Sequence, residues 1–134
     1  MLRRDFLLAT LSVASVALVP GVAGAAVGPA PFDDRAFAAA QAAGKPILVT
    51  VHADWCPTCA KQRPALDALY HTADFADLVV FNIDFDTQKA LVRKFDVRTQ
   101  STLIVFRGAA EKGRLAGESD AEKIKTLLLL TKAA

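Results

Sequence analysis

Cys56 and Cys59 are the only cysteines in this chain of 134 residues, and two residues separate them. On the first turn of a helix that spacing puts one side chain above the other, close enough for a disulfide to form without backbone movement. A cysteine pair that opens and closes can carry two electrons. The spacing therefore indicates thiol–disulfide exchange.

The sequence also predicts different roles for the two thiols. Cys56 falls at the start of a predicted helix, where free N–H groups and a partial positive charge favour a thiolate, so it is the predicted nucleophile. Cys59 lies one turn further on, and we expect it to be more buried and to act as the resolving thiol. Pro57 suits a first helical turn, and with Thr58 it tunes the redox potential.

Two other uses of the cysteines remain open at this point. A static disulfide closing so short a loop would stabilise the fold little. A zinc site could use His52, Cys56, Cys59 and His71, but in the usual zinc arrangement both histidines follow both cysteines. We expect no metal and no cofactor beyond the redox-active cysteine pair.

Hydrophobic periodicity predicts alternating helices and strands along the chain. We expect four helices: residues 32–43, a second from the cysteine pair to about residue 70, a third at 87–95 capped by Asp86 or Thr87, and a last one that begins at a capping box at 119–122. We expect strands at 47–53, 78–85, 101–106 and 113–117. This order predicts an α/β fold with a central mixed sheet of four to five strands and helices on both faces. The cysteines lie where a strand ends and a helix begins, where sites collect in open α/β folds.

Residues 1–25 are typical of an export signal. Arg3 and Arg4 precede an apolar stretch from Phe6 to Val19, and small residues end the segment at 23–25. The start resembles a twin-arginine signal. The apolar stretch is shorter than the roughly 20 residues of a membrane span, although an uncleaved anchor is the alternative. We expect residues 26–134 to form one domain in the bacterial periplasm, where a disulfide persists.

The charge balance excludes one class of partner. The formal net charge is +2, with no long basic run, so we expect no binding to nucleic acid. We also expect a monomer without stable membrane insertion once the signal is removed.

The segments 45–49 and 53–59 resemble the strand and active-site turn of the thioredoxin family, with Trp55, Pro57 and Thr58 completing the turn. Pro64, Asn82-Ile83-Asp84 and the segment 102–106 match further family positions, and the chain is most similar to exported members such as the C-terminal domain of DsbD-type reductases. The resemblance implies a thioredoxin fold and exchange with protein thiols and disulfides. It favours a reductase or electron-transfer protein supplied by an upstream thiol reductant over an oxidase.

The chain departs from the family pattern at the loop of Gln100, Ser101 and Thr102, which the resemblance implies faces the cysteines and binds the partner. Ser101 replaces the family's cis-proline. A non-proline cis bond costs about 2.5–4 kcal/mol, so we expect a trans Gln100–Ser101 bond. We expect the Ser101 hydroxyl and N–H to lie beside the sulfurs and to alter partner choice and metal binding by the thiolates.

A second departure concerns the proton of Cys59. Thr50 replaces the family's buried acid and Val80 its lysine partner, so proton transfer is left to water, Asp54 or His52. The alternative for His52 is a histidine packed in a strand. These departures keep open a second hypothesis, a thioredoxin-fold metal- or thiol-binding chaperone without turnover.

Overall fold

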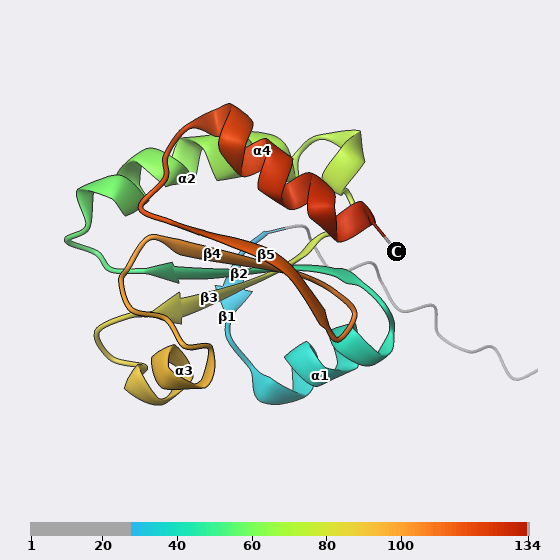
Figure 1. Cartoon of the computed structure of the whole chain (residues 1–134), viewed down its shortest axis with the longest axis horizontal. Coiled ribbons are helices and arrows are strands. Elements are labelled where there is room, and N and C mark those ends of the chain that lie inside the picture. Colours follow the sequence, from blue (N-terminus) through green and yellow to red (C-terminus); the bar gives the residue numbers. More distant parts are fainter. Residues whose placement is uncertain (1–27, 134) are drawn as a thin grey trace, which may run out of the picture.

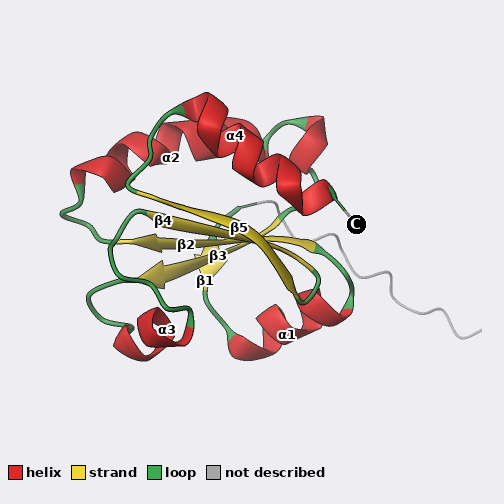
Figure 2. Cartoon of the chain, in the orientation of Figure 1, coloured by secondary structure: helices red, strands yellow, loops and turns green. Residues whose placement is uncertain are grey.

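A five-stranded sheet forms the centre of the molecule in the computed structural model, which describes residues 28–133. The strands are β1 (Ala30–Pro31), β2 (Pro46–His52), β3 (Val79–Asp84), β4 (Thr102–Arg107) and β5 (Ala110–Ala116), in the spatial order β1-β3-β2-β4-β5. The first three strands run parallel to one another, whereas β4 is antiparallel to β2 and β5 is antiparallel to β4 (Figure 2). The predicted mixed sheet is confirmed.

Helices cover both faces of this sheet, as predicted (Figure 1). One face carries α2 (Pro57–Tyr70) and α4 (Ala121–Leu129), and the other carries α1 (Asp34–Ala42) and α3 (Lys89–Lys94). Two short 3-10 helices, η1 (Ala73–Phe75) and η2 (Leu130–Lys132), follow α2 and α4.

The central strand β2 separates two apolar cores. Its side chains alternate between the faces of the sheet, because successive residues of a strand point to opposite sides. Ile47, Val49 and Val51 join a core that includes Phe32 and Phe37. Leu48 joins the opposite core, which contains residues of α2 and α4. Thr50 therefore points toward the α2 side, beneath the helix that carries the cysteines.

Several element boundaries differ from the sequence-based expectation, among them the starts of α3, α4 and β5. The predicted cap of α3 was wrong: the Asp84 carboxylate accepts the backbone N–H groups of Asp86 and Thr87 and holds them in a turn, so α3 begins only at Lys89. At α4 the N-cap is Asp120, which accepts the Lys123 N–H at 3.0 Å. Strand β5 starts at Ala110, three residues before the predicted position.

The predicted export signal lies outside the described residues. Within residues 28–133, no helix combines the length and apolar character needed to cross a membrane.

Candidate active site

The pairing of β2 with β4 brings the cysteines and the loop 100–102 to one edge of the sheet. Val51 lies opposite Thr102 in this antiparallel pair. The chain leaves β2 for α2 at the same edge where it enters β4, so two segments far apart in sequence meet there (Figure 1).

Cys56 is the N-cap of α2. Its backbone is extended, with φ −78° and ψ 113°, and its Sγ accepts the backbone N–H of Cys59 at 3.1 Å. This is the position where a side chain satisfies a free N–H of the first turn. Pro57, the first helical residue, needs no such partner because it has no N–H. The sulfur of Cys56 thus lies at the positive end of the helix, where a thiolate is stabilised.

The two thiols are equally buried. Cys56 is 3% exposed and Cys59 is 4% exposed, so the expectation that Cys59 would be the more buried of the two was wrong. Both pack with Ala53, and Phe85, directly after β3, packs against this cluster.

Desolvation and hydrogen bonding both act on Cys59, the predicted resolving thiol. Burial raises the pKa of the Cys59 thiol, and its hydrogen bond with Cys56 raises it further. Backbone hydrogen bonding at Ala53 and Ser101 opposes this and lowers the pKa, although the net direction is upward. Cys59 therefore stays protonated at a pH where an ordinary cysteine begins to ionise.

Trp55 presents its ring to solvent beside Cys56. It is 61% exposed, and its Nε1 donates to the Asp86 carboxylate at 2.7 Å. Pro57 is also exposed and Thr58 is half-buried. The turn that carries Cys56 thus offers an apolar surface next to this buried, predicted nucleophile, which suits contact with another protein chain.

The Gln100–Ser101 peptide bond, in the loop opposite the cysteines, is trans as expected, since residues 28–133 contain no cis bond. Ser101 is buried and left-handed, with φ 60°, a backbone that costs a non-glycine residue about 1–2 kcal/mol. Its hydroxyl donates to the Gln100 carbonyl at 2.6 Å, so that group is bound within the loop, and it is the backbone of Ser101 that acts on Cys59. Thr102 is buried and donates to the Thr99 carbonyl at 2.8 Å, while Gln100 is half-buried.

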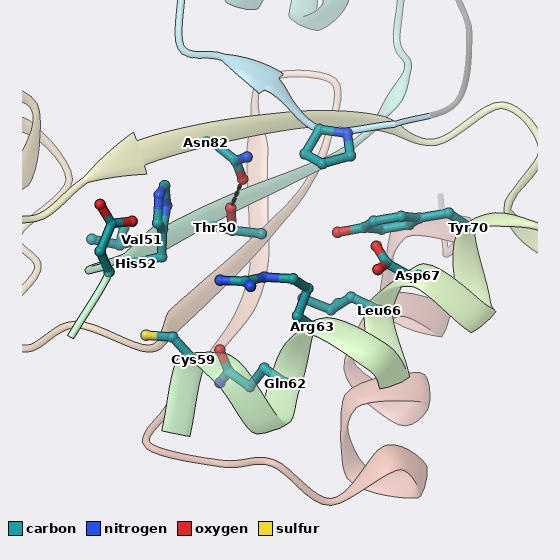
Figure 3. A pocket seen from close by; sticks show the side chains of 12 residues that line it. Thr50, Val51, His52, Cys59, Gln62, Arg63, Leu66, Asp67, Tyr70 and Asn82 are labelled. Carbon is teal, nitrogen blue, oxygen red and sulfur yellow. Dashed lines mark hydrogen bonds between the residues drawn. The ribbon is translucent and has the colours of Figure 1, made fainter. Parts of the chain in front are cut away.

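A polar cavity of about 170 Å³ lies behind Cys59, between β2 and α2 (Figure 3). Thr50 lines the cavity from β2, and its hydroxyl donates to the Asn82 side chain. His52 and Cys59 lie toward one end of the cavity and Tyr70 toward the other, with Arg63 between them. Water takes about 30 Å³ per molecule, so the cavity has room for several waters. Asp54 also lines it, which brings both predicted proton-transfer residues to the cavity that contains Cys59.

His52 is half-buried at the end of β2, directly opposite Asp84 of β3. Hydrogen bonding from the Thr87 backbone, above all, lowers the pKa of the Asp84 carboxyl, and the charge of His52 contributes in the same direction. His52 therefore interacts electrostatically with Asp84 as well as lining the cavity.

The four residues of the zinc alternative are not brought together. His71 is the C-cap of α2, at the opposite end of the helix from the cysteines. In the described part of the chain, no cluster of three or more His, Cys, Asp or Glu side chains could hold a metal ion.

Gln62 is a site residue that the sequence analysis missed. It lies three residues after Cys59 on α2 and is only 4% exposed. Its Nε2 donates to the Ser101 carbonyl at 3.0 Å and to the Glu118 carbonyl at 2.6 Å. The spacing from Cys59 places it on the same helix face, but nothing in the local sequence signals that a glutamine is buried there.

Comparisons with known proteins agree with this geometry. The thioredoxin family model matches residues 29–129. A thioredoxin of Mycobacterium tuberculosis (strain ATCC 25618 / H37Rv) is 34% identical over 85 residues, which cover 63% of this chain and 72% of that protein. The protein disulfide-isomerase erp38 of Neurospora crassa is 32% identical over 110 residues, covering 79% of this chain but only 29% of the isomerase.

Among solved structures, Trxlp from Edwardsiella tarda EIB202 is similar over 75% of this chain and 98% of that chain, with a TM-score of 0.73 and 44% sequence identity. Together with the family match, this likeness confirms the predicted thioredoxin fold.

The raised pKa of Cys59 can be measured directly. In a Cys56→Ser variant, burial still acts on Cys59, so the midpoint of its iodoacetamide alkylation rate against pH should lie above the about 8.5 of an unfolded cysteine. The same variant in denaturant is the control and should return to the ordinary midpoint. A native midpoint at or below that of the denatured control would contradict the assignment.

Proposed function

The chain belongs to the thioredoxin family of protein-disulfide oxidoreductases, with Cys56 and Cys59 as its redox pair, and on that premise we propose that it reduces protein disulfides outside the cytoplasm. The observation that carries this proposal is the placement of Cys56 as N-cap of α2, with Cys59 one turn behind it. Thioredoxins work through their own cysteine pair, without a cofactor.

The reaction transfers two electrons from the pair to the partner. The Cys56 thiolate attacks one sulfur of the partner disulfide, that S–S bond breaks, and the first partner thiolate leaves and takes a proton. Cys59 then loses its proton and attacks the Cys56 sulfur, releasing the second partner thiol. The Cys56–Cys59 disulfide that forms is reduced again by an upstream thiol reductant, with the protein acting as a monomer.

The reducing direction is supported by the relatives, among which thioredoxins recur. The reducing and oxidising directions share one chemistry and differ only in the reduction potential of the cysteine pair.

A reductase should reduce insulin with dithiothreitol as the thiol source, and its equilibrium potential against glutathione should lie near thioredoxin's about −270 mV. Cys56→Ser should abolish turnover because it removes the nucleophile. Cys59→Ser should retain attack and accumulate a mixed disulfide. A potential near about −120 mV would instead indicate an oxidant, and an inactive protein that purifies with bound metal would favour the chaperone alternative.

The proposed location rests on residues 1–25, which combine two arginines, an apolar stretch and a small-residue end. An oxidising compartment is also one in which an upstream reductant is needed to keep the cysteine pair reduced.

Export can be tested by fractionating a bacterial host that expresses the full chain. The protein should appear in the periplasm with an N-terminus near residue 26, and a version lacking residues 2–25 should stay in the cytoplasm. Arg3→Lys combined with Arg4→Lys should block export if the twin-arginine route is used. An unprocessed chain in the membrane fraction would indicate an anchor instead.

We further propose that His52 takes the proton of Cys59 during the resolving step, through the cavity they share. The other titratable or charged groups around this cavity are Asp54, Arg63, Asp67 and Tyr70, with Asp84 opposite His52 on β3. Of these side-chain types, imidazole is the one that exchanges a proton most readily near neutral pH, which suits a group that accepts and returns a proton.

A His52→Asn variant should resolve the mixed disulfide several-fold more slowly near pH 7, with the difference shrinking at higher pH because hydroxide can then remove the proton. Stopped-flow measurement of mixed-disulfide decay follows this step. Asp54→Asn, which changes the exposed acid of the same cavity, is the matched control. A larger effect of Asp54→Asn than of His52→Asn would assign the role to Asp54.

A further inference from the structure

The loop that faces the cysteines has a backbone that needs external support. Ser101 is left-handed although it is not a glycine, and it is buried between β4 and α2 rather than free at the surface. Such a conformation persists only where the surrounding structure holds it. Because proline fixes φ near −65°, the chain cannot use a proline to build this shape.

The support comes from hydrogen bonds to one carbonyl. The carbonyl oxygen of Ser101 accepts one hydrogen bond from the Gln62 Nε2 at 3.0 Å and another from the Gly117 N–H at 3.1 Å. The Gln62 Nε2 also donates to the Glu118 carbonyl at 2.6 Å. The buried amide of Gln62 thus ties the cysteine helix to both the Ser101 loop and the segment that connects β5 with α4.

Gln62 is well placed to transmit this support to the redox site. It follows Cys59 by three residues on the buried face of α2, and the loop it binds also interacts through the Ser101 backbone with Cys59. A change at Gln62 would therefore move the loop relative to the sulfurs without touching either cysteine.

We propose that Gln62 is a positioning residue that holds the Ser101 loop in its left-handed form and so sets the surface on which a protein disulfide docks beside Cys56. This proposal rests on the proposed disulfide-reductase function. It predicts that Gln62 affects the binding of protein partners but not the reaction with a small disulfide, because a small disulfide needs no docking surface.

The test compares insulin with the small disulfide 5,5′-dithiobis(2-nitrobenzoate) as substrates of the wild type and of Gln62→Met, which keeps the length of the side chain and removes its donors. We expect the KM for insulin to rise about tenfold with kcat little changed, and the rate with the small disulfide to stay within about twofold. Lys61→Met, an exposed neighbour on the same helix, is the matched control and should change neither rate.

A second substitution separates positioning from a general loss of structure. Glycine adopts a positive φ without strain, so Ser101→Gly should restore most of the insulin KM in a Gln62→Met background. If Gln62→Met fails to fold, Gln62→Asn, which is too short to reach both carbonyls, is measured in the same way.

Equal losses on both substrates, no loss on insulin, or no rescue by Ser101→Gly would overturn the proposal. A wild-type protein that reduces neither substrate would instead overturn the proposed function.

Discussion

The antiparallel register between β2 and β4 fixes the site, because it sets Val51 opposite Thr102 and so brings Cys56 and Ser101 to the same edge of the sheet. The same register sorts the side chains of β2 between two cores. A slip by one residue would turn Val49 and Val51 to the α2 face and Thr50 into the opposite apolar core. Core packing and the meeting of thiols and loop therefore depend on one pairing.

Within that frame, the shape of the loop depends on hydrogen bonds rather than on an imino acid. The left-handed Ser101 has a conformational cost that its carbonyl offsets by accepting two donors, one from α2 and one from Gly117. The loop therefore keeps a backbone N–H at position 101, which a proline would lack, and this backbone acts on Cys59. The departure from the family pattern thus leaves a backbone hydrogen bond between Ser101 and Cys59.

The sequence predicted the parts of this site that have local signals. A run of β-branched residues predicts the buried β2, and Cys-Pro-Thr-Cys after it predicts a helix N-terminus with two thiols on one turn. Two of the missed features involve residues far apart in the chain: Phe85 packs against the cysteines, and the buried Gln62 donates to two distant carbonyls. The third is local, because the Asp84 carboxylate accepts the N–H of Thr87 and so delays the start of α3. None of these contacts leaves a periodic pattern.

Cys56 and Cys59 have nearly the same small exposed fraction, so exposed area alone does not distinguish the roles proposed for them. Cys56 accepts an N–H at the start of α2, whereas desolvation and then the hydrogen bond with Cys56 raise the pKa of the Cys59 thiol. A protonated Cys59 does not attack the mixed disulfide until its proton has somewhere to go. Thr50 stands where the family resemblance implies a buried acid, and the cavity next to it is lined by both Cys59 and His52. In the mechanism we propose, proton transfer through this cavity sets the lifetime of the mixed disulfide, which links the replacement of one buried acid to how long a partner stays bound.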